Sequence, residues 1–283
     1  MTVDDVPRAE RVTAIGFHEL DSRMSPRSWP DPELRPPRRS AGWIARTEHL
    51  LGTDPGGSWV AEVDDQILGV VVSFVRDKLW LLASYAVVPH AQGLGLGKAL
   101  LAPALDHGRG CLRGMLNASN DPRAVRRYHE AGFRLYPQML LRGLPDRSRL
   151  PVVEHVREGT ESDFDLMDSL DRRTRGAAHG VDHHQLIRQF RLLVTERSSG
   201  QGYAYVDNGV ALLAASDKRA ASRLLWEALA SSDGEVLSGH LTPENSWAVD
   251  VGLAARLELH HDGYAGLRHL KPPAPYIPHG ALM

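Results

Sequence analysis

Apolar and polar residues form distinct blocks in the first half of the chain. Three runs rich in Val, Leu and aromatic residues occupy positions 58–63, 66–75 and 79–88, and short pairs of charged residues separate them. Short apolar runs divided by turn-forming residues are typical of strands joined by tight turns. The pattern therefore predicts a three-stranded antiparallel meander.

Helical patterns flank these strands. Residues 6–20 carry apolar side chains at helical spacing, and a second helix is expected over residues 41–51. The segment between them, residues 25–40, holds five prolines, and proline supplies no backbone N–H, so we expect a surface loop there. After the strands we expect one helix directly, and another that Asp121 caps with Pro122 at its first position.

The pattern restarts in the second half of the chain. A strand is expected over residues 150–156, a helix over 161–173 and an amphipathic helix over 218–232. Two apolar runs, 202–206 and 210–215, flank an Asp-Asn-Gly turn and predict a hairpin. The order of these elements is similar to that of the first half.

A shift of 124 residues aligns the two halves without a gap over their later elements. It places Asp121 on Asn245 and Ala124 on Ala248. Such self-similarity indicates a duplicated structural unit. We therefore expect an α/β protein with two domains, residues 1–145 and 150–283, joined by a short polar and proline-containing linker.

Composition narrows the class of protein. The formal net charge is -2 and the chain has one cysteine, so charge gives no reason to expect nucleic acid or an anionic membrane as partner, and an intramolecular disulfide is excluded. No stretch of about 18 apolar residues occurs, so we expect no membrane segment and a cytoplasmic location. The doublets His183-His184 and His260-His261 are interpreted as surface residues, and no metal site is expected.

A glycine-rich loop follows the third strand. Gly93, Gly95 and Gly97 alternate at the point where the strand meets a helix, a setting in which free N–H groups bind anions. The spacing lacks the G-x-G-x-x-G of a dinucleotide fold, and Ala99 stands where a Walker loop needs Ser or Thr. The glycines alone therefore leave two interpretations open, a tight turn and a phosphate cradle.

Two motifs together resemble one family. The stretch VVPHAQGLGLG, residues 87–97, and the later DPRAVRRYHEAGF, residues 121–133, resemble the loop and helix motifs of the GNAT N-acetyltransferases. The duplicated pattern is similar to that of tandem GNAT proteins. The resemblance implies two domains, each a mixed and mainly antiparallel sheet flanked by helices, with acetyl-CoA as co-substrate, no metal, and a monomer or homodimer.

The resemblance also implies roles for particular residues. It assigns coenzyme A binding to Val87, Val88, Gln92, Gly93, Leu94, Gly95, Leu96, Gly97, Lys98 and Asp121. Tyr128 would protonate or stabilise the leaving thiolate when an amine attacks the thioester directly. Two alternatives stay open, in which Tyr128 only packs the helix and Asp121 only caps it.

The proton acceptor for the attacking amine is not evident. The strand over residues 79–88 contains no Asp or Glu, so Ser84, Tyr85, Glu62, His18 and a water chain all remain candidates. The implied activity is acetyl transfer from acetyl-CoA to an amine in a ternary complex. The alternative is a non-catalytic acyl-CoA-binding or regulatory protein.

The second copy lacks the corresponding chemistry. The shift places Asp217, Arg219 and Ala221 on the three loop glycines, and Gly252 on Tyr128. A carboxylate and bulky side chains do not suit a phosphate cradle. We therefore expect residues 150–283 to have a structural role, pairing with the first copy and walling its substrate cleft.

Overall fold

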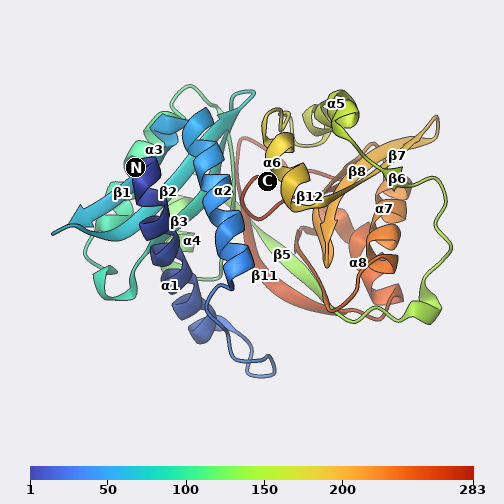
Figure 1. Cartoon of the computed structure of the whole chain (residues 1–283), viewed down its shortest axis with the longest axis horizontal. Helices are drawn as coiled ribbons and strands as arrows, with labels where there is room; N and C mark the ends of the chain where they lie inside the picture. The colour runs from blue at the N-terminus through green and yellow to red at the C-terminus, as the bar shows by residue number, and fades with distance from the viewer. The chain divides into compact units, whose positions relative to one another are not determined.

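The computed structural model describes all 283 residues and has a mixed α/β architecture (Figure 1). The chain folds into two compact units. Unit 1 contains residues Met1–Gly114 and Asn120–Ala131, and unit 2 contains Met115–Ser119 and Gly132–Met283. None of the helices is long and apolar enough to cross a membrane.

Unit 1 contains three strands that form the expected meander. They are β1 (Ser58–Val63), β2 (Gln66–Arg76) and β3 (Leu79–Val87). Both pairings, β1 with β2 and β2 with β3, are antiparallel. The connecting pairs Asp64-Asp65 and Asp77-Lys78 all have positive φ, the backbone twist that suits two-residue hairpin turns. The centre of β2 is fully buried and forms the core of the unit.

Four long helices complete unit 1. They are α1 (Val6–Met24), α2 (Pro37–Thr53), α3 (Leu96–His107) and α4 (Pro122–Glu130). Helices α1 and α2, drawn in blue in Figure 1, pack against each other, and α1 also packs on β2 and β3. Helix α2 begins four residues earlier than the apolar pattern predicted, because Pro37 has the φ angle of a first helical position. The loop is correspondingly shorter than residues 25–40.

Unit 2 contains two groups of strands. The element bounds are β4 (Arg113–Ala118), β5 (Arg134–Gly143), β6 (Arg157–Glu158), β7 (Arg191–Arg197), β8 (Gly200–Asp207), β9 (Gly209–Ala215), β10 (Val236–Leu241), β11 (Glu258–Arg268) and β12 (Tyr276–Ile277). One group has the order β4-β11-β5-β10, and the other is the sheet β12-β9-β8-β7-β6. Strand β5 pairs antiparallel with both β11 and β10. The last strand of the first sequence copy therefore lies inside unit 2.

The helices of unit 2 are α5 (Phe164–Thr174), α6 (Asp182–Gln189), α7 (Lys218–Ala230) and α8 (Ser246–Ala254). The 124-residue shift relates the starts of α4 and α8, and of β5 and β11, whereas the starts of α3 and α7 differ by 122 residues. The apolar face of α7 is buried in the core of the unit. The order helix, strand, helix, strand from α3 to β5 thus recurs from α7 to β11.

Two parts of the second half differ from the sequence-based expectation. Residues 150–156 form no strand: Val152 is 91% exposed, and pairing is limited to β6. Pro151 cannot donate a ladder hydrogen bond, which disfavours a strand at that point. Helix α6 and strand β7 were not predicted, because their polar and apolar residues show no run long enough to indicate a period.

Candidate functional site

The glycine loop of unit 1 presents unpaired backbone N–H groups. Gly93 and Gly95 have φ angles of 84° and 87°, a left-handed conformation that only glycine adopts without strain. No other atom would crowd a side chain at either position. Backbone conformation, rather than lack of space, therefore requires these two glycines.

Helix α3 begins immediately after this conformation. Gly95 is its N-cap residue, and the first intrahelical bond runs from Ala99 N to Gly95 O at 3.1 Å. The N–H groups of Leu96, Gly97 and Lys98 consequently have no acceptor within the helix. These residues are half-buried or exposed. Free N–H groups and the positive end of a helix dipole together favour a bound anion.

The end of β3 lies directly before this loop. Val88 N donates to Leu68 O at 2.9 Å, so its amide already has an acceptor. Val87 is paired with Gly69, and because hydrogen-bonded and non-hydrogen-bonded pairs alternate, the N–H and C=O of Val87 point away from β2. Gln92 Nε2 donates to Val87 O at 2.9 Å. This bond ties the loop to the end of the strand.

Two tyrosines lie behind the first turn of α3. The Tyr128 side chain on α4 is buried, and its ring centroid is 6.2 Å from that of Tyr85 on β3. Burial raises the pKa of the Tyr128 hydroxyl well above its usual value, and Tyr85 adds to the effect. A side chain at Gly97 would collide with the Tyr85 hydroxyl. Gly97 is therefore required for close packing, unlike the other two glycines.

Asp121 caps α4, and two arginines neutralise its charge. Its Oδ1 accepts from Arg123 N at 2.8 Å, while Oδ2 contacts Arg23 Nη2 at 2.9 Å and Arg123 Nη2 at 2.7 Å. Hydrogen bonds from the Arg123 side chain lower the pKa of the Asp121 carboxyl the most. The pairing reduces the repulsion that this carboxylate would exert on a nearby anion.

The candidate proton acceptors differ in their surroundings. Ser84 is buried and accepts a hydrogen bond from Trp43 Nε1 at 3.1 Å. Glu62 forms an exposed ion pair with Arg8 at 3.3 Å. His18 Nδ1 is buried without a hydrogen-bond partner. None of these groups is distinguished as a base by its contacts.

The helix start in unit 2 that corresponds to the glycine loop is occupied by a side chain. Asp217 is the N-cap of α7, and its Oδ1 accepts from Arg219 N and Ala220 N, both at 3.0 Å. The chain's own carboxylate thus satisfies the N–H groups that α3 leaves free. Gly252 packs so closely on Leu141 that no side chain fits there. Unit 2 therefore has neither an open cradle nor a hydroxyl equivalent to that of Tyr128.

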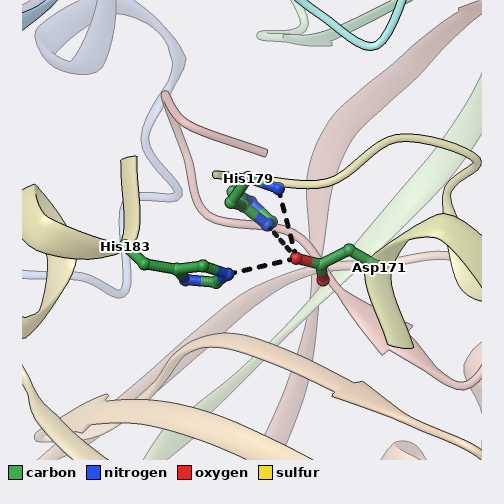
Figure 2. Close-up of side chains that lie close together, drawn as sticks. All are labelled: Asp171, His179 and His183. Atoms are coloured by element: carbon green, nitrogen blue, oxygen red, sulfur yellow. Dashed lines mark hydrogen bonds and ion pairs between the residues drawn. The ribbon is translucent and has the colours of Figure 1, made fainter. Parts of the chain in front are cut away.

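A buried cluster of ionisable side chains lies elsewhere in unit 2 (Figure 2). Asp171, His179 and His183 place atoms that could ligate a metal within 4.8 Å of one another. His179 Nδ1 lies 2.7 Å and His183 Nε2 3.4 Å from Asp171 Oδ2. The prediction that His183 lies on the surface is wrong, because α6 turns it inward, while the side chain of His184 is half exposed.

The contacts of Asp171 favour an internal ion network over cation binding. Tyr203 donates its hydroxyl to Asp171 Oδ1 at 2.5 Å, so both carboxylate oxygens contact donors. Burial opposes ionisation of Asp171, but His179 and His183 lower its pKa overall, and Arg175 contributes in the same direction. Arg175 is itself buried, and a buried positive charge that interacts with Asp171 disfavours a bound cation there.

A comparison with protein families finds a match in the first half of the chain. Residues 15–133 match the model of the acetyltransferase (GNAT) family. That range contains the glycine loop and Tyr128, and unit 1 supplies nearly all of it. No curated protein sequence matches the chain.

Solved structures share the fold over nearly the whole chain. A Pyrococcus horikoshii protein assigned as an acetyltransferase is 18% identical, covers 100% of this chain and 93% of its own, and has a TM-score of 0.76. A GCN5-related N-acetyltransferase from Sphaerobacter thermophilus is 13% identical, with coverages of 94% and 93% and a TM-score of 0.60. A Kribbella flavida protein of the same description is 15% identical, with coverages of 94% and 69% and a TM-score of 0.58.

Proposed function

Because residues 15–133 match the model of the GNAT acetyltransferase family, we propose that the protein transfers an acetyl group from acetyl-CoA to an amine. The observation that carries the proposal is the row of unpaired N–H groups at the start of α3, with the left-handed glycines that expose them. In this proposal unit 1 performs the reaction and unit 2 has a structural role.

Residues 92–98 would hold the pyrophosphate of coenzyme A. Successive N–H groups at a helix N-terminus suit a dianionic ligand, and the open space around Gly93 and Gly95 admits one. Asp121 lies at the start of α4, whereas the glycine loop lies at the start of α3. Arg23 and Arg123 offset the charge of Asp121. We assign Asp121 to helix capping and to the orientation of these arginines.

The end of β3 would position the reacting thioester. The coenzyme supplies an activated acetyl group, and the amide of Val87 is the backbone donor that points away from β2. A donor aimed at the thioester carbonyl stabilises the negative charge that develops there. Val88 would contribute packing rather than this hydrogen bond, because its N–H is bonded to Leu68.

Tyr128 would act on the leaving group. When the amine attacks, the carbon–sulfur bond breaks and the sulfur gains negative charge, which a phenol can neutralise by donating its proton. The raised pKa of Tyr128 keeps that proton in place at neutral pH. The buried setting, next to the Tyr85 ring, holds the side chain in one position.

The direct test measures both binding and turnover. Calorimetry with coenzyme A should show saturable binding at one site per chain, and thiol release from acetyl-CoA should increase with at least one member of a panel of amines, amino acids and peptides. Binding without turnover on any acceptor would favour a non-catalytic acyl-CoA-binding protein. Absence of binding would refute the proposal.

A further inference from the structure

One face of α2 carries two arginines on either side of Trp43. Arg39, Trp43 and Arg46 are spaced four and three residues apart, so they share a face of the helix. Trp43 is buried, and its Nε1 donates to Ser84 of β3 at 3.1 Å. Ser84 precedes Val87 by three residues, about 10 Å along a strand. Helix α2 packs on β2, and the Trp43 hydrogen bond also joins this helix face to β3, the strand that leads to the proposed thioester position.

A third arginine of this group has a carboxylate partner. Arg35 contacts Glu10 at 2.7 Å, and Ser40 also donates to that carboxylate at 2.8 Å. The Arg35 guanidinium lies 5.8 Å from the centre of the Trp43 ring. Arg35 and Glu10 thus form a balanced pair that holds the aromatic side chain in place.

Arg46 has no such partner. It is half-buried and forms no hydrogen bond or ion pair. Burial lowers its pKa to about 10, and the positive charges of Arg35 and Arg39 contribute. Burial raises the pKa of Asp21, and its electrostatic pairing with Arg39 and with His18 lowers it. No carboxylate is bonded to Arg46, so its partly buried guanidinium has donors available to an oxyanion.

We propose that Arg46, assisted by Arg39, binds an oxyanion of the acceptor, so that the substrate is an amine that also carries a carboxylate or a phosphate. The planar guanidinium binds either group through paired hydrogen bonds. This inference rests on the proposed acetyl transfer, because it deepens the substrate class of the same site. An acceptor anchored in this way would have its amine directed along β3 towards Val87.

The first experiment compares matched amines in the wild type and in Arg46→Ala. Suitable pairs are β-alanine with β-alaninamide, and phosphoethanolamine with ethanolamine. We expect the wild type to prefer one anionic member, and Arg46→Ala to lower kcat/KM for it by about 10- to 100-fold while leaving the neutral amine unchanged. Arg11→Ala, which removes an exposed arginine of α1, is the control and should preserve the preference.

A second experiment does not depend on turnover. Inorganic phosphate and acetate are titrated into the protein with coenzyme A at saturation, so that the glycine loop is already filled. The wild type should bind one of them, and Arg46→Ala should lose that binding while Arg46→Lys retains part of it. Equal use of charged and neutral amines, or anion binding unaffected by Arg46→Ala, would overturn the inference. If coenzyme A itself does not bind, the proposed function fails, and anion binding that depends on Arg46 would still be measurable.

Discussion

At the scale of single residues, Gly97 and Tyr128 pack against the same side chain, that of Tyr85. Gly97 has no side chain because the hydroxyl of Tyr85 occupies that space. Tyr85 in turn lies against the ring of Tyr128. A residue at the start of α3 is therefore linked by packing to the proposed acid on α4, so that the coenzyme and the acid would be held in a fixed relation.

Replacing the Tyr128 hydroxyl tests its proposed role. Tyr128→Phe keeps the ring and its packing but removes the proton donor, so kcat should fall by about 100-fold or more while the Kd for coenzyme A stays the same. The pKa of Tyr128 is raised, so in the wild type its ionisation should cause no loss of rate up to about pH 10, the usual pKa of tyrosine. An unchanged kcat in stopped-flow assays would remove Tyr128 from the mechanism.

Asp171 should contribute to stability rather than to activity. Asp171→Asn removes the charge that His179 and Tyr203 surround, and breaking a buried pair costs about 3–5 kcal/mol of unfolding free energy. Asp165→Asn changes an exposed carboxylate on the same helix and should cost almost nothing. Urea denaturation measures both differences.

The pH dependence of this contribution has a definite sign. The pKa of Asp171 is lower in the folded state, so its stabilisation is complete above the unfolded value of about 4 and is lost as the pH falls below it. The acid-induced loss of stability should therefore be smaller in Asp171→Asn than in the wild type.

Dialysis against a chelator should leave the wild-type Tm unchanged, and a drop in Tm would show that the cluster holds a metal.

At the scale of elements, the connection between β3 and α3 determines whether the helix start is open. The same connection in unit 2 ends in the Asp217 cap of α7. A helix start can thus be satisfied by its own chain or left free for a ligand. In the connection between β3 and α3, glycines stand where a capping side chain would be, so the first N–H groups of α3 have no side-chain acceptor.

Gly97→Ala tests this element. The added methyl group meets the Tyr85 hydroxyl, so the Tyr85 ring or the first turn of α3 must shift, and a shift of the turn takes its N–H groups out of alignment. The Kd for coenzyme A should rise by about tenfold or more, which corresponds to at least about 1.4 kcal/mol. Gly110→Ala is the matched control, because that exposed glycine has no close neighbour. Equal affinities of the two variants would contradict the proposed cradle.

Sequence patterns predicted most elements of unit 1, because its strands are continuous apolar runs and its turns carry charged pairs. The same reasoning was wrong at residues 150–156, where Val152 is exposed and no strand forms. It also missed the inward position of His183, because a doublet of histidines gives no information on which member faces the core. The unpartnered charge of Arg46 depends on tertiary contacts and has no signal in the sequence.

At the scale of the whole molecule, the sequence repeat and the compact units do not coincide. Strand β5 ends the first copy of the sequence pattern but belongs to unit 2, where it lies between β11 and β10. Leu140 and Leu141 on this strand are buried. The stretch over residues 1–145 therefore ends in a strand whose partners lie outside it.

Cutting the chain after residue 145 should leave that strand unpaired. We expect the fragment 1–145 to show fast amide hydrogen exchange over β5 and a tendency to aggregate, because an exposed apolar edge strand pairs with other chains. Co-expression with a fragment of residues 146–283 should restore slow exchange in β5. Slow exchange in the isolated fragment would mean that β5 has an alternative partner.

The Asp217 cap has a consequence in terms of gene history. The glycine codons GGU and GGC become aspartate codons through a single base change, and at a helix start that change fills an open position with the carboxylate of the chain itself. If the two halves share an origin, loss of the proposed ligand site and gain of a stabilising cap would therefore need only one step. Replacing Asp217 by glycine would remove the helix cap and its stabilisation without rebuilding the rest of a ligand site. The substitution is therefore favoured in one direction, from glycine to aspartate.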